Sequence, residues 1–245
     1  MTKHKTTINP YIIITLLTVL LFVIQFLISR FGWLIAGLFD VSAIDPDGLF
    51  AGVSVHHIVT LFCSLALIAL LSGIKGIRGF KLRPKYDSKG VKYTAVFCTA
   101  VLVYYIVTYL IEIHSHSVNT YDIAFNTRNV IGTLGFQLLL TGPSEEVCFR
   151  ALPITLLLFY LNPDSKKDRI IAVVISAFLF GLGHIGVMTF SIPWFQVCYA
   201  FVFGLAFGFV QLKTNSIIYP MIMHSVSNLI SVGSSYLYMY ISGKS

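Results

Sequence analysis

Charged side chains are scarce in this sequence. Only 11% of its 245 residues are Asp, Glu, Lys or Arg, whereas 56% are hydrophobic, and the mean hydropathy is +0.83. A soluble domain of this length would present far more charge to water. The composition therefore excludes an ordinary soluble domain and predicts an all-α, polytopic transmembrane helical bundle.

Cysteine pairs are absent as well. The four cysteines stand singly in apolar segments, and no CxxC pair occurs. This spacing excludes a disulfide framework and a cysteine-based zinc site, so we interpret most of the cysteines as small packing residues. The sequence also lacks an HExxH motif, a low-complexity linker and a soluble segment. We therefore expect a single integral membrane domain over residues 1–245.

Positive charge is unevenly distributed. The net charge is +7, which in a soluble protein would point to nucleic acid as a partner. Seven basic residues instead fall in one short loop between apolar runs, and they are Lys75, Arg78, Lys81, Arg83, Lys85, Lys89 and Lys92. Such a loop is retained on the cytoplasmic side of a membrane. We therefore predict no nucleic-acid partner, a multi-pass protein of a bacterial-type plasma membrane, and a cytoplasmic N-terminus.

Long apolar runs are abundant. Each can cross a bilayer as a helix, and they cover residues 11–29, 53–72, 91–111, 129–161, 170–187, 194–212 and 216–241. This count predicts about seven to eight spans. The run over 129–161 is too long for a simple span, and we expect its helix to break at Gly142-Pro143, which is tolerated where a helix lines a cavity. Gly204 and Gly208 form a GxxxG step suited to close helix packing.

Two adjacent carboxylates interrupt this apolar background. Glu145, Glu146 and Arg150 lie inside the run that contains Gly142-Pro143. Ionisable groups are costly in hydrocarbon and mark a functional site by default. In a helix Glu146 and Arg150 are four residues apart and can pair, which leaves Glu145 free on another side. The alternative is a purely structural Glu–Arg pair that holds two helices together.

Two later spans also carry polar side chains. His184 follows Phe180 by four residues, and Asn228 follows His224 by four, so each pair shares a helix face. At about 1.5 Å of rise per residue, these groups and Glu145 lie roughly 12–25 Å from the cytoplasmic ends of their helices. The depths overlap, and we predict one shared site.

The remaining histidines are interpreted as peripheral. His56 and His57 lie near the outer end of the second run, and adjacent residues on a helix are not expected to face one site, so we place them at the membrane interface. His114 and His116 form an HxH pair in a polar segment without a third ligand nearby. A metal site is therefore not favoured there.

The convergent groups allow two kinds of chemistry. A carboxylate beside a histidine can deprotonate water, and a second histidine with an amide donor can stabilise the oxyanion formed when this water attacks a carbonyl. Alternatively, two histidines and one or two glutamates suit a zinc ion with one position open for water. We expect no cofactor, with zinc as the alternative.

Together these residues resemble a known family. Three motifs agree with it in type, spacing and order, and they are Glu145-Glu146-x-x-x-Arg150, Phe180-x-x-x-His184 and His224-x-x-x-Asn228. They are similar to the motifs of the CAAX-prenyl-protease and bacteriocin-processing family, also called Abi. The resemblance covers about residues 130–235, which we interpret as the catalytic core.

The resemblance implies an intramembrane, glutamate-dependent endopeptidase. It implies that Glu145 and His184 activate water, that His224 and Asn228 hold the oxyanion, and that the Glu–Arg pair supports the site. The implied substrate is a membrane-embedded peptide or a prenylated-like or lipidated protein.

Two positions depart from the family pattern. Cys148 stands where the family commonly has a bulky aliphatic residue, and Ala151 stands where it has glycine. A thiol beside Glu145 keeps acyl transfer open, with Cys148 as a supporting residue, and the estimated depth fits a lipid substrate in the outer leaflet. The alternatives to a protease are a family member acting in lipoprotein N-acylation and a noncatalytic bacteriocin-immunity or scaffold protein.

Overall fold

The computed structural model describes residues 9–74, 77, 79–115, 124–185 and 192–242. Every regular element in these ranges is helical and none is a strand, which confirms the predicted all-α class. The longer elements are α1 (Pro10–Ala36), α2 (Ala51–Ser72), α3 (Ser88–His114), α4 (Thr127–Phe136), α6 (Leu152–Tyr160), α7 (Lys166–Leu182), α8 (Trp194–Thr214) and α9 (Ile218–Ser242). Lys75 and Arg78 of the basic loop, and His116 of the HxH pair, lie outside the described residues.

Among the described residues, four helices have the length and hydropathy of membrane spans, and they are α1, α2, α3 and α8. Large apolar side chains face outward on two of them: Leu16 and Leu20 on α1, and Val103 and Leu110 on α3, are each exposed over more than half of their surface. An apolar surface of this kind is stable in lipid rather than in water. The chain is therefore a membrane protein, and the finer count of seven to eight spans stays a prediction.

The helix that contains the two carboxylates is continuous. Between α4 and α6 it runs through a π-helical turn η1 (Gln137–Thr141), the short α5 (Gly142–Glu146) and a second π-helical turn η2 (Val147–Ala151). The backbone of Gly142 is ordinary right-handed helix, with φ −56° and ψ −53°, so the predicted break at Gly142-Pro143 is wrong. Proline lacks an N–H and crowds the carbonyl four residues back, and the wide turn immediately before Pro143 relieves that crowding.

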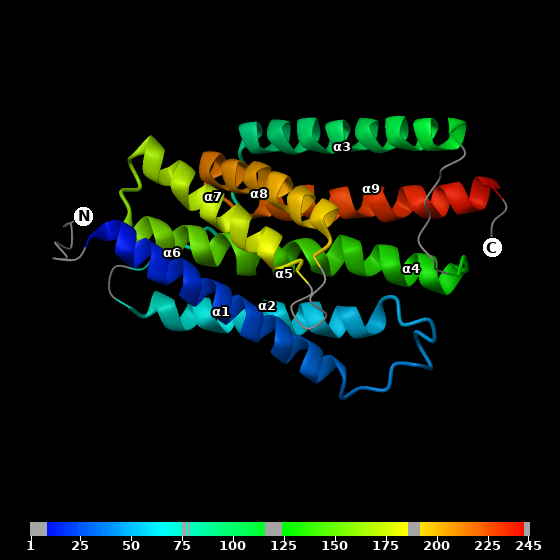
Figure 1. The fold of residues 1–245 in the computed structure, drawn as a ribbon, viewed down its shortest axis with the longest axis horizontal. Helices are drawn as coiled ribbons and strands as arrows, with labels where there is room; N and C mark the ends of the chain where they lie inside the picture. The colour runs from blue at the N-terminus through cyan, green and yellow to red at the C-terminus, as the bar shows by residue number, and fades with distance from the viewer. Residues whose placement is uncertain (1–8, 75–76, 78, 116–123, 186–191, 243–245) are drawn as a thin grey trace.

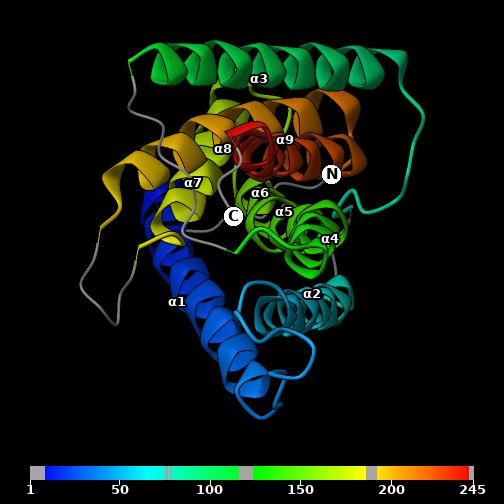
Figure 2. The same ribbon diagram turned by 90° about the vertical axis from the view of Figure 1, so that its right-hand side faces the viewer.

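This long helix forms the centre of the bundle (Figures 1 and 2). α1 and α2 pack together on one side of it, whereas α8 and α9 lie on the other side and α3 is outermost. α7 packs on both α6 and α8. α5, at the middle of the long helix, contacts α2 and α9. The polar residues of α5 are therefore enclosed between the two groups of helices.

The contact between α7 and α8 depends on glycine. A Cβ atom on Gly204 would lie 3.0 Å from Cα of Ala177, and a Cβ atom on Gly208 would lie 2.9 Å from Cγ1 of Val173. Both distances are shorter than an ordinary van der Waals contact. The close packing predicted from the GxxxG step is confirmed.

Gly142 lets α9 approach the centre of the long helix. A Cβ atom here would overlap the backbone carbonyl oxygen of Met221 and the hydroxyl of Ser225. We expect Gly142→Ala to lower the free energy of unfolding by roughly 1–3 kcal/mol, because the backbone of α9 must move. Gly135→Ala is the matched control, since a Cβ atom there meets nothing within 4 Å, and it should stabilise the helix by about 0.5–1 kcal/mol. Thermal unfolding in detergent measures both, and equal Tm values would contradict the steric cause.

Asp45 caps α2 from the loop that precedes it. Its Oδ1 accepts a hydrogen bond from the backbone N–H of Leu49 at 2.9 Å, and its Oδ2 accepts from Phe50 and Ala51, both at 2.7 Å. Burial alone would raise the pKa of this carboxyl. The hydrogen bonds to its ionised form outweigh burial and hold the pKa of Asp45 below its ordinary value of 3.8.

This cap predicts a pH-dependent stability. Because the folded-state pKa of Asp45 lies below the unfolded value, its contribution is fully present well above pH 3.8 and is lost as the pH falls through the folded pKa. At neutral pH, Asp45→Asn should lower the free energy of unfolding by about 0.5–2 kcal/mol. Acidification should reduce this difference in stability between the variant and wild type. The control is Asp40→Asn, on the same loop with an exposed carboxylate that accepts from the backbone N–H of Ser42, which should change the stability much less than Asp45→Asn does. A pH-independent gap between Asp45→Asn and wild type in thermal unfolding would rule this explanation out.

Candidate active site

Glu146 and Arg150 form a fully buried ion pair. Both side chains are 0% exposed, and Arg150 Nη1 lies 3.2 Å from Glu146 Oε1. The guanidinium carbon is 3.8 Å from the centre of the Phe180 ring and 5.4 Å from that of Phe207. The pair predicted from the four-residue spacing is confirmed. A cation buried this deeply is stable only beside its counter-ion, and the two ring faces add to its stabilisation.

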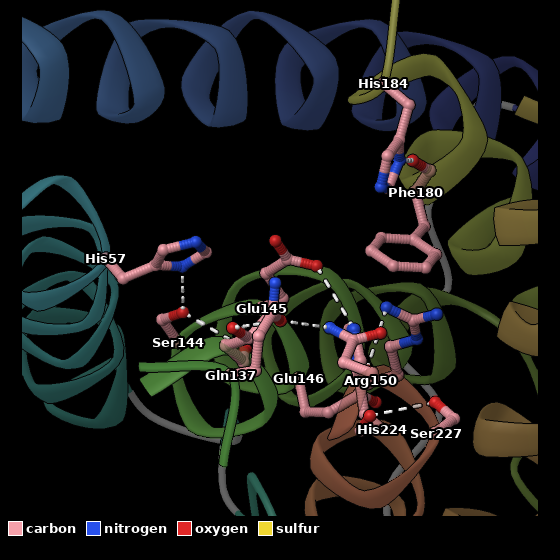
Figure 3. A network of polar contacts seen from close by, with 12 residues as sticks. His57, Gln137, Ser144, Glu145, Glu146, Arg150, Phe180, His184, His224 and Ser227 are labelled. Atoms are coloured by element: carbon pink, nitrogen blue, oxygen red, sulfur yellow. Dashed lines mark hydrogen bonds and ion pairs between the residues drawn. The ribbon is translucent and has the colours of Figure 1, made fainter. Parts of the chain in front are cut away.

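His224 lies between the two glutamates. Its Nδ1 is 2.8 Å from Glu146 Oε1, and its Nε2 is 3.5 Å from Glu145 Oε2 (Figure 3). Because a carboxylate oxygen accepts hydrogen bonds, Nδ1 of His224 carries a hydrogen and donates a hydrogen bond to Glu146. The ring stacks on Phe207 with 5.2 Å between centroids. His224 is therefore held in one orientation, with Nε2 directed toward Glu145.

Glu145 points away from the buried pair. Its side chain is 20% exposed, against 0% for Glu146. In Figure 3 its carboxylate lies between the side chains of His57 and His184. One of the two carboxylates thus engages Arg150 and the other stays open, as the spacing predicted. The chemical role of Glu145 stays a prediction.

His184 lies just beyond the end of α7. Its Nδ1 is 2.8 Å from the backbone carbonyl oxygen of Phe180, and its ring meets the Phe180 ring edge-on at 4.8 Å. A carbonyl oxygen only accepts, so Nδ1 carries the proton and Nε2 is left as a hydrogen-bond acceptor. The four-residue spacing of the second motif therefore sets the tautomer of His184.

Asn228 is held by a residue that sequence reasoning missed. Its Nδ2 donates to Gln137 Oε1 at 2.9 Å, and the Thr141 hydroxyl donates to the same oxygen at 3.1 Å. Gln137 opens the first π-helical turn. It lies inside the apolar run over residues 129–161. The amide of Gln137 is an isolated polar group in that run, and an unpaired amide is costly in an apolar environment, so its presence could have indicated a polar partner.

His57 is part of the site, and the prediction that it lies at the membrane interface is wrong. It is only 6% exposed, and its Nδ1 is 2.7 Å from the hydroxyl oxygen of Ser144. His56 and His57 also line one cavity together, although they are adjacent on α2. The cavity is wide enough to contact both rings, because it extends from α1 to α5. His56 borders its α1 side, and His57 borders its α5 side at the contact between α2 and α5.

One cavity opens between α1, α2 and α7, and we call it the α1–α2 cavity. Its volume is ≈ 370 Å³. On α1 and α2 its polar or amphipathic lining residues are Gln25, Ser29, Arg30, Trp33, His56, His57 and Thr60, and Phe22 and Phe26 line it from α1 as well.

A second cavity opens among α3, α8 and α9, and we call it the α8–α9 cavity. Its volume is ≈ 460 Å³, and its lining includes Tyr105, Gln137, Tyr199, Phe203, His224 and Asn228. Of the residues that the structure describes, four line both cavities, and they are His57, Glu145, Phe180 and His184. The four residues predicted to be catalytic therefore all border the α8–α9 cavity, and Glu145 can be reached from two sides.

Cys148 borders the α1–α2 cavity but is only 1% exposed. Its backbone carbonyl accepts a hydrogen bond from Gln25 Nε2 at 2.9 Å. Within the part of the chain that the structure describes, no group of three or more His, Cys, Asp or Glu has metal-ligand geometry. Whether the site works with or without a metal stays a prediction.

Residues 127–230 match the family model of the type II CAAX prenyl endopeptidases described as Rce1-like. This segment is similar to that family. The resemblance predicted from the three motifs is therefore confirmed. The Rce1-like segment begins at α4 and ends within α9, so it contains all seven residues predicted for the site, whereas α1, α2 and α3 lie before it. The match points to a membrane endopeptidase and gives no support to acyl transfer. No curated protein and no solved structure matches the chain.

Proposed function

We propose that this protein is an intramembrane endopeptidase that hydrolyses a peptide bond in a membrane-associated peptide or in a prenylated-like or lipidated protein. One observation carries the proposal: Glu145 is a carboxylate open to a cavity, while Oε1 of the adjacent, buried Glu146 contacts both Arg150 and His224. An open carboxylate within an otherwise apolar protein is suited to proton transfer.

Water activation is assigned to Glu145 and His184. Both residues border the same cavities. The Nδ1–H of His184 donates a hydrogen bond to the backbone carbonyl of Phe180, so Nε2 is the ring nitrogen that acts as an acceptor. A water held by both groups has its lone pair free to attack a carbonyl carbon. One proton passes to Glu145 as the C–O bond forms, and Glu145 returns it to the departing amine nitrogen when the C–N bond breaks.

Oxyanion stabilisation is assigned to His224 and Asn228. Asn228 uses one amide hydrogen on Gln137 and has a second to donate. Nε2 of His224 lies 3.5 Å from Glu145, longer than a hydrogen bond, so when protonated it is available to a substrate oxygen. Two such donors stabilise the negative charge of a tetrahedral intermediate.

The proposal extends to topology. We assign seven to eight spans, a single membrane domain over residues 1–245, a cytoplasmic N-terminus and a bacterial-type plasma membrane, on the basis of the apolar runs and the basic loop. The expected partner is a membrane-embedded peptide, lipidated protein or lipid substrate, with no nucleic acid and no required cofactor.

The test compares membrane proteins from cells that carry wild type, Glu145→Ala or the control Glu112→Ala, a change at the end of α3 away from both cavities. Intact-mass and N-terminal peptide mass spectrometry should find an uncut precursor that accumulates only with Glu145→Ala. A lipoprotein lighter by one acyl chain, with unchanged peptide length, would replace hydrolysis by acyl transfer. Identical profiles from equally expressed proteins would favour the noncatalytic immunity or scaffold role.

A further inference from the structure

Gln137 is an isolated amide at the border of the α8–α9 cavity. The two residues that follow it in η1, Leu138 and Leu139, are 44% and 67% exposed and belong to the apolar outer surface. An amide this close to an apolar surface is costly unless a partner takes up its hydrogen bonds. Gln137 is half-buried and lines the cavity instead. Its polar end is therefore directed to the inner side of the long helix.

A hydrogen bond joins Gln137 on η1 to Asn228 on α9, and Asn228 Nδ2 lies 2.9 Å from Gln137 Oε1. Each amide has a donor end and an acceptor end, so one hydrogen bond joins the two side chains in either rotation of the pair, and Asn228 keeps at least one N–H for the cavity. Within the described part of the chain, the Asn228 side chain makes no other hydrogen bond. Gln137 is thus the residue that sets the direction of the Asn228 amide.

Thr141 holds Gln137 in turn. Its Oγ1 lies 3.1 Å from Gln137 Oε1, so the first and last residues of the π-helical turn contact each other. Gly142 follows directly, and its lack of a side chain lets the backbone of α9 approach at this level. The π-helical turn and the close approach together bring Gln137 within reach of α9, and such turns are frequent at functional sites.

The two proposed oxyanion donors are therefore held in the same way. His224 is fixed by Glu146 at its Nδ1 and by the stacked ring of Phe207. Asn228 is fixed by Gln137. A donor stabilises a developing negative charge most when it is held in place beforehand, because it then needs no reorientation in the transition state. Glu146 is part of the first motif, whereas Gln137 lies outside all three motifs.

We propose that Gln137 is a positioning residue of the oxyanion site, which holds the amide of Asn228 toward the α8–α9 cavity. The inference rests on the proposed endopeptidase function. It extends the site to the first π-helical turn, and it predicts that Gln137 affects the transition state only through Asn228.

A double-mutant cycle tests this dependence. Wild type, Gln137→Leu, Asn228→Ala and the double variant are purified in detergent and assayed with a quenched fluorescent peptide that contains a prenylated CAAX sequence. Gln137→Leu should lower kcat by roughly 10- to 50-fold with little change in KM, and Asn228→Ala should lower it by roughly 10²–10³-fold. The double variant should match Asn228→Ala within about twofold, because the residue that Gln137 positions is already missing. Losses that multiply in the double variant, or a kcat of Gln137→Leu within about twofold of wild type, would overturn the role.

A matched control makes the same substitution elsewhere in the cavity. Gln196 on α8 also lines the α8–α9 cavity and has no hydrogen bond to Asn228 among the described contacts. Gln196→Leu should change kcat by less than about twofold. A loss equal to that of Gln137→Leu would attribute the effect to the polarity of the cavity and overturn the assignment.

Thr141→Val provides a milder variant that is informative even if Gln137→Leu does not fold. It keeps a similar shape and removes the hydroxyl that contacts Gln137. It should lower kcat by roughly 3- to 10-fold in the presence of Asn228 and by less than about twofold in the Asn228→Ala background. The same loss in both backgrounds would contradict a role that acts through Asn228.

Nuclear magnetic resonance measures the positioning without hydrolysis. In protein with isotope-labelled asparagine, the side-chain amide signal of Asn228 is assigned by its absence from Asn228→Ala. Its order parameter should be that of a rigid group in wild type and should fall below about 0.6 in Gln137→Leu or Thr141→Val. An Asn228 amide that stays rigid in these variants would overturn the role of Gln137, whatever their activity.

The two proposals fail in different ways. An Asn228 amide that is ordered by Gln137, in a wild-type protein without Glu145-dependent cleavage, would refute the endopeptidase and with it the catalytic meaning of this contact. Glu145-dependent cleavage that Gln137→Leu leaves unchanged would keep the endopeptidase and remove Gln137 from the oxyanion site.

Discussion

Glu145→Gln is expected to leave the protein folded and to lower kcat by roughly 10²–10⁴-fold, the usual contribution of a general acid–base group. The amide is nearly isosteric with the carboxylate but cannot take a proton from water. Folding should survive because this side chain is partly exposed to a cavity and does not carry the buried ion pair. The loss should appear in kcat more than in KM, since substrate contacts remain.

The measurement uses purified wild type, Glu145→Gln and Glu112→Gln with a quenched fluorescent peptide that contains a prenylated CAAX sequence. Size-exclusion profiles and Tm establish that all three proteins are folded. The α3 control should cleave at the wild-type rate. Cleavage by Glu145→Gln within about twofold of wild type would remove the central residue of the mechanism.

Arg150→Met is expected to destabilise the protein by about 3–5 kcal/mol, because it leaves Glu146 as an uncompensated charge in the interior. Both partners are 0% exposed, so water cannot replace the lost ion. The same substitution empties the space between Phe180 and Phe207, where the guanidinium now lies. We expect aggregation or a Tm lowered by many degrees, measured by fluorescence-detected size-exclusion and thermal unfolding in detergent.

The double variant Glu146→Gln/Arg150→Met is the control for charge. It removes both ions, while the amide oxygen introduced by Glu146→Gln can still accept the Nδ1 proton of His224. The double variant should therefore be more stable than Arg150→Met alone. A single Arg150→Met variant with the wild-type Tm would contradict the structural role of the pair.

The adjacent glutamates thus divide two tasks between them. Glu146 anchors Arg150 and His224 and belongs to the architecture, whereas Glu145 faces the cavities. Opposite outcomes for the two residues, loss of activity for one and loss of fold for the other, are a direct test of this division.

Local interactions account for what was predictable from the sequence. The pair of Glu146 with Arg150 follows from four-residue helical spacing, and so does the shared face of His224 and Asn228. The all-α class follows from hydropathy, and the close approach of α7 and α8 follows from the GxxxG step. The family resemblance rests on the same short spacings, so it was visible before any tertiary contact was known.

Tertiary packing decided the remainder of the site. His57 meets Ser144 across 87 positions of sequence, and Gln137 meets Asn228 across 91. No local sequence pattern encodes either of these long-range contacts, because the partners come together only when α2 and α9 pack on opposite sides of the long helix. The continuous passage through Gly142-Pro143 also depends on context, since α-helical propensity alone predicts a break there and a π-helical turn relieves it. The sequence by itself determined which residues are polar inside the membrane and which of them share a helix face; the tertiary structure decided which helices face one another, and therefore which acceptors surround Glu145.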